Sequence, residues 1–494
     1  MDWIVSLTPE VAKDPLAALA APPKGASLVE LRVDLFPDLD LRTAVSACPM
    51  PMLVTLRSTA EGGRGPDDPA IRSVTLAAAR DAGAALIDLE HARDVELTDR
   101  LGLPPEQVVL SWHDPDGTPR DLETITAALH ETRSRLVKIV PTTRSLVDLE
   151  RVLALHPRFN HRRAHNRRLV TFGMGPVGIA TRYLAPLLGP PIGFAAWSAG
   201  AEAAPGQLTV DQLESVTGHL HGRPRKLFGV VGRDVSRSLS PALHNAGYRA
   251  CGLPDLFVPI SAPDVEELTE LITDLGTTLF DRVGLGAYGW AVTTPYKGIA
   301  AELAEVAAPR ARRAMAANTL ILREQGVAAD NTDADGIVGS VHKLGIDPSG
   351  LTAVVQGTGG AARGAAVGLY LAGAEVHLRG RDHQRTREIA DLLDVGVLEP
   401  GSMPATAAIL VNATPLGATP GDPAPFTEQE LAAATAVIDM VYANHETPLV
   451  RAARHAGVPV ADGIDVLAHQ AFAQFAAFTT QLPPKKAMWA AVGR

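Results

Sequence analysis

A lysine inside an apolar segment is the first residue whose chemistry needs explaining. Lys138 lies in LVKIV at 136–140, where its neighbours on both sides are aliphatic. Burial disfavours a charged amine, so it would lower the pKa of Lys138 and favour the neutral form that attacks a carbonyl to make a Schiff base. Alternatively, the side chain extends to the surface and keeps its charge in water. The segment alone leaves both interpretations open.

A second group of residues suits proton handling beside an alcohol. Lys297 ends the segment AVTTPYK, and Asp333 lies in NTDADG. A lysine and an aspartate held together can act as proton shuttle and charge partner; as isolated residues they would more often form a surface ion pair. Ser238 and Ser240, two apart in SRSLSP, could bind a carboxylate together, or could instead cap the next helix.

A glycine-rich turn follows an apolar segment later in the chain. The stretch 351–382 has the order strand, GTGG turn, helix, strand, which is typical of the opening of a dinucleotide-binding unit. Gly357, Gly359 and Gly360 would let the backbone approach a pyrophosphate at the start of a helix. About 110 residues precede this turn in the second half of the chain. We therefore expect a separate substrate domain before the nucleotide domain.

The fold of the first half must bring polar residues from distant parts of the sequence together. Stretches at 70–83 and 121–136 have apolar residues at helical spacing and alternate with apolar runs of strand length. Eight such units in about 220 residues predict a (β/α)8 barrel with its active site at the C-terminal ends of the strands. An open doubly wound sheet is the alternative. The predicted strands are 2–7, 28–33, 52–56, 85–89, 108–112, 136–140, 169–173 and 192–197.

Composition narrows the class of protein. The 494 residues are 46% hydrophobic and 20% charged, which favours globular domains over disorder. The net charge of −10 gives no general attraction to nucleic acid. Two distant cysteines, Cys48 and Cys251, suggest neither a disulfide framework nor a metal site. Without a signal-like start or a long apolar run, we expect a cytoplasmic protein with no membrane partner.

Polar residues of the first half occur in seven segments: ELRVD, TLRSTAEGG, IDLE, SWHD, LVKIV, FGMGPVGIATR and APGQ. In order and spacing these segments resemble type I 3-dehydroquinate dehydratase over residues 2–220. The resemblance implies that Lys138 forms an imine with the ketone of 3-dehydroquinate, that His113 is the general base and acid, and that Glu61 orients it. Arg182 would grip the substrate carboxylate, and the product would be 3-dehydroshikimate. The remaining substrate contacts would be Glu30, Arg32, Arg57 and Gln207.

The second half resembles shikimate dehydrogenase over about 227–494. Its segments are SLSP, VTTPYK, ANT, NTDADG, GTGGAAR, NATPLG, DMVYANHETPL and DGIDVLAHQAFAQF. The resemblance implies that Lys297 and Asp333 handle the hydroxyl proton while hydride passes between substrate and nicotinamide. It implies substrate contacts by Ser238, Ser240, Thr293, Asn318, Asp333, Tyr442 and Gln470. It also implies cofactor contacts by Gly357, Gly359, Gly360, Ala361, Arg381, Arg385, Met440 and Gly463.

The two resemblances together predict an enzyme that makes 3-dehydroshikimate and reduces it to shikimate. We expect a dehydratase barrel at 1–222, a shikimate-binding domain at 226–336 completed by 465–494, and a Rossmann domain at 337–464. The alternatives are a quinate or quinate/shikimate dehydrogenase in the second half, or a non-catalytic metabolite-binding protein. No metal is expected.

The cofactor and two departures from the family patterns remain open at this level. Arg381 and Arg385 favour NADP over NAD, because a guanidinium there can meet a ribose 2′-phosphate. Asp382 could repel that phosphate, or could simply cap the helix that follows. Ala203 and Ala291 stand where the two families usually have a serine and an asparagine, so we expect altered substrate affinity at these positions.

Overall fold

The computed structural model describes residues 1–11, 13–160, 168–204, 206–273, 280, 282–399, 401–402 and 408–494. This chain forms two compact units. The first contains Met1–Arg225 together with Asp234–Arg237 and Val258–Gly286, and the second contains the other residues. The division into three domains made above stays a prediction.

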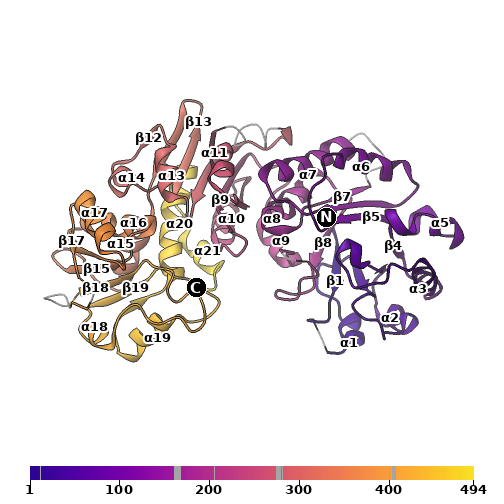
Figure 1. Cartoon of the computed structure of the whole chain (residues 1–494), viewed down its shortest axis with the longest axis horizontal. Coiled ribbons are helices and arrows are strands. Elements are labelled where there is room, and N and C mark those ends of the chain that lie inside the picture. Colours follow the sequence, from indigo (N-terminus) through magenta and orange to yellow (C-terminus); the bar gives the residue numbers. More distant parts are fainter. Residues whose placement is uncertain are drawn as a thin grey trace. The chain divides into compact units, whose positions relative to one another are not determined.

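The first sheet has eight parallel strands in the order β7-β6-β5-β4-β3-β2-β1-β8. Within the described residues no ladder joins β7 to β8, so the sheet is a nearly closed barrel, and helices follow its strands (Figure 1). The predicted (β/α)8 architecture is confirmed. The strands are β1 (Asp2–Leu7), β2 (Leu28–Arg32), β3 (Met52–Thr55), β4 (Leu86–Glu90), β5 (Val108–Asp114), β6 (Leu136–Pro141), β7 (Leu169–Thr171) and β8 (Ile192–Ala196).

The two helical stretches named from the sequence are helices of this barrel. Asp68 caps α3 by accepting hydrogen bonds from the backbone N–H groups of Ala70 and Ile71. The helices are α1 (Pro15–Ala20), α2 (Leu41–Ala47), α3 (Pro69–Asp81), α4 (His91–Asp94), α5 (Leu97–Arg100), α6 (Leu122–Glu131), α7 (Leu146–Phe159), α8 (Gly175–Leu184) and α9 (Val210–Thr217), with 3-10 turns η1 (Thr59–Glu61), η2 (Pro105–Gln107) and η3 (Ala185–Leu188).

One end of the barrel interior is filled by an apolar layer. It has a contribution from each strand: Ile4, Leu28, Leu53, Leu86, Val109, Leu136, Val170 and Ile192. Because side chains alternate along a strand, the residue two positions later also points inward. That next layer is mostly polar and includes Ser6, Glu30, Thr55, Asp88, Ser111 and Lys138. The barrel therefore changes from an apolar floor to a polar site toward the C-terminal ends of its strands.

A mixed six-stranded sheet opens the second half of the chain, in the order β10-β9-β11-β13-β14-β12. Helix α20 returns from the end of the chain to pack on α15, β11 and β13 of this part. The elements are β9 (Lys226–Gly232), α10 (Ser240–Ala250), β10 (Asp255–Ser261), α11 (Val265–Thr273), β11 (Ala287–Val292), α13 (Lys297–Glu302), β12 (Val306–Ala307), α14 (Pro309–Ala314), β13 (Thr319–Arg323), β14 (Gly326–Asp330), α15 (Asp333–Lys343), α20 (Gly463–Thr479) and α21 (Lys485–Ala490).

The third sheet is parallel and has the order β17-β16-β15-β18-β19-β20. Numbered along the chain, this is the 3-2-1-4-5-6 order of a Rossmann fold, as predicted. Its elements are β15 (Thr352–Gln356), α16 (Gly360–Leu371), β16 (Glu375–Arg379), α17 (His383–Leu393), β17 (Gly396–Val397), β18 (Ala408–Asn412), α18 (Glu428–Ala432), β19 (Ala436–Asp439), α19 (Pro448–His455) and β20 (Val460–Ala461).

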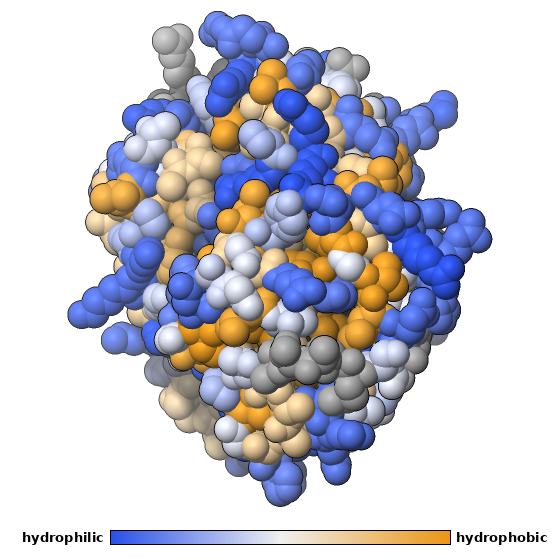
Figure 2. Space-filling view, turned by 90° about the vertical axis from the view of Figure 1, so that its left-hand side faces the viewer, coloured by the Kyte–Doolittle hydropathy of each residue, from blue (hydrophilic) through white to orange (hydrophobic). Residues whose placement is uncertain are grey.

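The outer surface is of the mixed kind that globular proteins have. Figure 2 shows hydrophilic residues over much of one face, with smaller hydrophobic areas between them. Across the described ranges, no helix combines the length and the apolar character needed to cross a membrane.

Candidate active sites

Lys138 lies inside the barrel on β6 and is only 6% exposed. The surface interpretation of this lysine is therefore not what the structure shows. Its Nζ lies 3.6 Å from Oε1 of Glu30 and 3.9 Å from the centre of the Phe194 ring. Burial lowers the pKa of the Lys138 amine, although the carboxylates of Glu30 and Asp88 oppose this effect. Burial therefore makes the Lys138 amine easier to deprotonate than a lysine in water, which helps it to act as a nucleophile.

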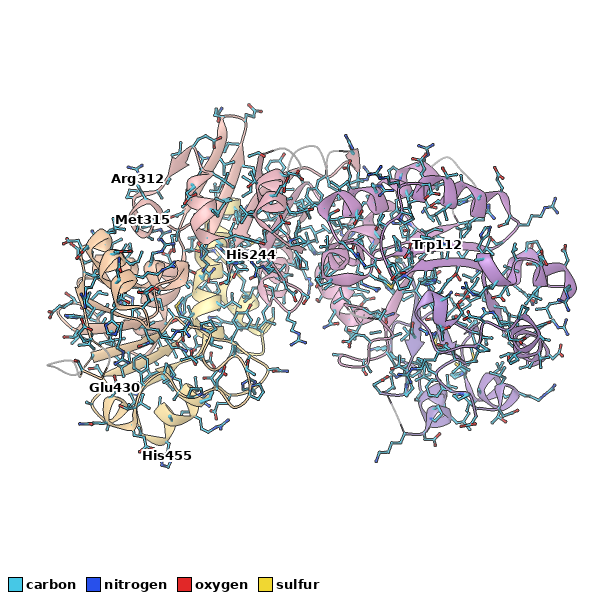
Figure 3. The ribbon with its side chains drawn as sticks, in the orientation of Figure 1. Trp112, His244, Arg312, Met315, Glu430 and His455 are labelled. Atoms are coloured by element: carbon cyan, nitrogen blue, oxygen red, sulfur yellow. The ribbon has the colours of Figure 1, made fainter. Side chains whose placement is uncertain are left out.

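His113 lies on β5, on the same inner face of the barrel as Lys138. Ser111 of β5 pairs with Lys138, and side chains two apart on a strand share a face. The rise of a strand puts His113 roughly 7 Å further toward the open end of the barrel. His113 follows Trp112, which is labelled on β5 in Figure 3. The lysine and the histidine therefore lie on the same inner face of the barrel.

Glu61 holds His113 from the turn η1. Its Oε2 lies 3.1 Å from Nδ1 of His113 and accepts the backbone N–H of the same residue at 3.0 Å. Burial, with Arg57 and Lys138 nearby, holds the pKa of His113 well below its usual value. Burial and the neighbouring carboxylates raise the pKa of Glu61 to about 8. Glu61 thus contacts both the ring and the backbone of His113, which is the contact that its predicted orienting role requires.

Arg57 is surrounded by acceptors inside the barrel. Its guanidinium donates to Glu61 at 2.9 Å, Glu90 at 3.1 Å and Asp88 at 2.9 Å, and also to Ser111. Although burial opposes it, these carboxylates raise the pKa of Arg57. In the described structure its hydrogen bonds thus go to protein groups that support Glu61, and contact with substrate remains a prediction.

Arg182 has the opposite environment. It is buried on α8, and its Nε and Nη2 have no hydrogen-bond partner among the described residues. The guanidinium lies 4.5 Å from the ring centre of Phe172, and burial lowers its pKa to about 10. Phe172 in turn lies 6.1 Å from Phe194, the ring beside Lys138. A buried guanidinium with two nitrogens lacking partners among the described residues is suited to an anionic group of a ligand.

The other predicted contacts of the barrel site are connected through one carboxylate. Although burial opposes ionisation, the charges of Lys138 and Arg32 help to lower the pKa of Glu30 to about 2. The Ser6 hydroxyl donates to Glu30 and lies 3.4 Å from Nε2 of Gln207. Arg32 is held by a double hydrogen bond to Asp34. The structure therefore joins Lys138, Glu30 and Gln207, whereas Arg32 already has a protein partner.

Asp88 and Ser111 were not assigned roles from the sequence. Both lie in the polar layer, where Ser111 donates to Asp88 at 2.5 Å and both contact Arg57. The signal that could have found Asp88 is a charged residue at an inward position of an apolar strand, the same signal that singled out Lys138. The backbone N–H of Ala203 donates to Oε1 of Gln207, and the effect of the missing serine hydroxyl on affinity stays a prediction.

In the second unit, Lys297 and Asp333 form a buried pair. Nζ of Lys297 lies 2.8 Å and 2.6 Å from the two carboxylate oxygens, and both residues are under 10% exposed. Asn318 donates from Nδ2 to Oδ1 of Asp333 at 3.0 Å. Three residues predicted to act together are thus in direct contact. The exposed ion pair considered above is not what forms.

The other predicted substrate contacts come from separate parts of this unit. The Ser238 hydroxyl accepts the N–H of Ser240 at 3.3 Å and hydrogen-bonds with Tyr442. Gln470 lies on α20 against Gly336 of α15. Thr293 follows β11, and its N–H donates to the carbonyl of Val231. Ser238 and Tyr442 are therefore brought together across a sequence separation of about 200 residues.

The glycine-rich turn leads into α16 as predicted. Gly357 has φ +129°, a conformation that favours glycine, and a Cβ there would lie 2.9 Å from the carbonyl oxygen of Ala413. Gly359 is the N-cap of α16, and Ala361 lies in its first turn. A Cβ on Gly360 would lie 2.8 Å from Cβ of Lys297. The start of the helix is thus open to a phosphate and packs directly on the candidate proton donor.

Asp382 is the N-cap of α17. Its carboxylate accepts the backbone N–H of Arg385 at 3.0 Å, so the capping interpretation of this residue is confirmed. Arg381 and Arg385 are exposed beside it. Nearby Arg379 is held by Gln356 and by Glu430, which is labelled in Figure 3. Two exposed arginines just beyond β16 suit a phosphate on the adenosine ribose.

The last predicted cofactor contacts lie after β19 and at the start of α20. Met440 donates its N–H to the carbonyl of Asn412. A Cβ on Gly463 would lie 2.3 Å from the carbonyl oxygen of Val441, so the two segments are in close contact. In the part of the chain that the structure describes, no group of three acidic, histidine or cysteine side chains is arranged to hold a metal ion.

Comparisons with known proteins divide the chain in the same place. Residues 4–224 match the family model of type I 3-dehydroquinase. Residues 230–320 match that of the shikimate dehydrogenase substrate binding domain. A bifunctional 3-dehydroquinate dehydratase/shikimate dehydrogenase of Arabidopsis thaliana is 28% identical over 94% of this chain and 79% of its own length.

Two further similarities concern the second half. A shikimate dehydrogenase (NADP(+)) of Caulobacter vibrioides is 36% identical over 52% of this chain and 91% of its own length. The crystal structure of shikimate 5-dehydrogenase from Thermus thermophilus in complex with NADP(H) and shikimate has 29% identity and a TM-score of 0.49, covering 54% of this chain and 97% of that one. The sequence matches show that the second half of the chain belongs to the shikimate dehydrogenase family and that the first half is similar to type I 3-dehydroquinase.

Proposed function

We propose that the chain is a bifunctional enzyme of shikimate biosynthesis. It dehydrates 3-dehydroquinate to 3-dehydroshikimate and then reduces that product to shikimate with NADPH. The observation that carries the proposal is the Lys138 amine, which is buried beside Glu30 and next to rings that lead to the unpaired Arg182. A substrate with a ketone and a carboxylate matches that pair of groups. A cytoplasmic location remains part of the prediction.

The dehydratase reaction follows from the chemistry of the amine. The neutral Lys138 amine adds to the ketone carbon, and loss of water gives an iminium that draws electrons from the adjacent carbon. His113 takes a proton from that carbon, with Glu61 fixing the ring. The neighbouring hydroxyl then leaves as water with the proton from His113. Hydrolysis of the iminium releases 3-dehydroshikimate and restores the amine.

The dehydrogenase half carries out proton transfer and positioning. Lys297, paired with Asp333, gives a proton to the ketone oxygen as it becomes the hydroxyl of shikimate. Ser238 and Ser240 bind the substrate carboxylate, and Asn318 with Tyr442 and Gln470 orients the ring. Bound NADPH supplies the hydride, which is chemistry that the protein only orients. Gly357, Gly359 and Gly360 receive its pyrophosphate, and Arg381 with Arg385 receives the 2′-phosphate.

One coupled assay tests both halves. Purified full-length chain, 3-dehydroquinate and NADPH are mixed, and the loss of NADPH absorbance is followed together with the products by chromatography. Lys138→Ala should stop turnover of 3-dehydroquinate but not of added 3-dehydroshikimate. Lys297→Ala should let 3-dehydroshikimate accumulate. Absence of both reactions would overturn the proposal. In a separate assay of alcohol oxidation, faster oxidation of quinate than of shikimate would show that the second half of the chain is a quinate dehydrogenase.

A further inference from the structure

A buried glutamine one helical turn beyond Gln470 contacts the dehydrogenase site from outside. Gln474 of α20 is 1% exposed. Its Nε2 donates to the backbone carbonyl of Asn318 at 3.0 Å and to the hydroxyl of Thr319 at 3.2 Å. We infer that Gln474 is a positioning residue of the dehydrogenase, which fixes Asn318 and through it Asp333. This inference rests on the proposed dehydrogenase function.

The orientation of the Asn318 amide depends on the groups around its oxygen. Oδ1 accepts the N–H of Thr332 at 2.7 Å and the hydroxyl of Thr319 at 2.9 Å. With donors facing Oδ1, the amide nitrogen must face Asp333, to which it donates at 3.0 Å. A flipped amide would set N–H groups against these donors. The correct amide orientation therefore holds the carboxylate that pairs with Lys297.

The Thr319 hydroxyl transmits the effect of Gln474. A hydroxyl has one hydrogen to donate and can also accept. Because Gln474 donates to this oxygen, the hydroxyl hydrogen is free to point to Oδ1 of Asn318. Without this donor the hydroxyl can rotate more freely, and Oγ1 of Thr332 lies 3.2 Å away as another acceptor. If the hydroxyl turned there, Oδ1 of Asn318 would keep the N–H and hydroxyl of Thr332 as donors but lose that of Thr319.

The surroundings of Gln474 make its hydrogen bonds hard to replace with water. Neighbouring residues of α20 pack as aromatic rings: Phe478 stacks on Phe228 at 4.9 Å, and Phe475 lies 5.5 Å from Tyr248. His244, labelled in Figure 3, is fully buried and lies 5.9 Å from the Phe478 ring. A buried carbonyl that loses its donor in such an apolar setting is destabilised unless it shifts. Any such shift moves Asn318.

Gln474→Met tests the inference, since methionine keeps the length and volume but cannot donate. Because a misplacement of about 1 Å can cost roughly 10²-fold in rate, we expect kcat for shikimate oxidation to fall about 10-fold. KM for NADP and the dehydratase rate should stay within about twofold of the wild-type values. Lys343→Met is the matched control. It removes a different bond to α20, between Lys343 and Asp465, and should leave kcat unchanged.

A double-mutant cycle separates positioning from a general structural role. If Gln474 acts through Asn318, then Gln474→Met should have no further effect on kcat once Asn318→Ala is present. Additive effects, or an unchanged kcat in the single variant, would overturn the inference. Thr319→Val breaks the same connection without altering α20. It should reproduce the fall in kcat, so the inference can fail even if Gln474→Met does not fold. A wild-type protein that cannot oxidise shikimate would overturn the proposed function and this inference together.

Discussion

Arg182 offers a sharp test of the barrel site, because its charge should destabilise the free protein and strengthen the binding of an anionic substrate. Its guanidinium is buried with two nitrogens unpaired in the described structure. A charge held in this way is costly in the free protein and becomes favourable when an anion binds. We therefore expect Arg182→Met to make the barrel slightly more stable and the dehydratase much weaker.

The magnitude follows from the pKa of the group. Its fall from 12.5 to about 10 corresponds, at about 1.4 kcal/mol per pH unit, to roughly 3 kcal/mol of destabilisation in the charged form. The variant also loses the contact with Phe172, worth about 2 kcal/mol for a desolvated cation and ring. The remaining gain is about 1 kcal/mol, or about 2–4 °C in the melting temperature of a unit of this size.

The assay compares melting and kinetics in one set of variants. Removing one partner of a buried charged contact costs about 2–5 kcal/mol, so kcat/KM of the dehydratase should fall roughly 10²-fold or more. Added 3-dehydroshikimate should stabilise wild type and Lys138→Ala against heating but not Arg182→Met. A variant that melts below wild type and keeps its kcat/KM would show that Arg182 is structural and that the reasoning is wrong.

Three further predictions follow from the two sites. Borohydride in the presence of 3-dehydroquinate or 3-dehydroshikimate should inactivate the dehydratase irreversibly, and peptide mapping should find the adduct on Lys138; an adduct on another lysine would refute the assignment. Lys297→Ala should reduce dehydrogenase turnover by roughly 10²-fold or more with a smaller change in substrate binding, as general acid–base catalysis requires; a nearly unchanged turnover would make Lys297 structural. NADPH should be preferred over NADH, because the Asp382 carboxylate is occupied as a helix cap while Arg381 and Arg385 are exposed; comparing kcat/KM for the two cofactors decides this, and a preference for NADH would contradict it.

The barrel could be predicted from the sequence because its signal is local. Each buried strand is an apolar run, and each of the eight runs became a strand within a few residues of its predicted bounds. Lys138 stood out for the same reason, as a charge inside such a run. The partners of Arg57 could not be predicted, because Asp88 and Glu90 reach it only when β3 and β4 lie side by side.

In the second half, the sequence order suggested which residues belong together but not how they touch. Asp382 had two interpretations, and its hydrogen bond to the backbone of Arg385 shows that it caps the helix. Gln474 gave no sequence signal of its own, because its partner Asn318 lies 156 residues earlier. Contacts between residues so far apart in the sequence depend on how α20 packs, and no local sequence pattern predicts that packing.

Because α20 packs back on the first part of the second unit, the two active sites can form only in one order during synthesis. The barrel strands and their helices, which end with α9 at Thr217, leave the ribosome well before α20, and domains generally fold as they emerge. The shikimate site must wait, because Gln470 and Gln474 are made only near the end of the chain. A nascent chain can thus acquire its lyase before its reductase, and loss of the last 30 residues would silence only the second.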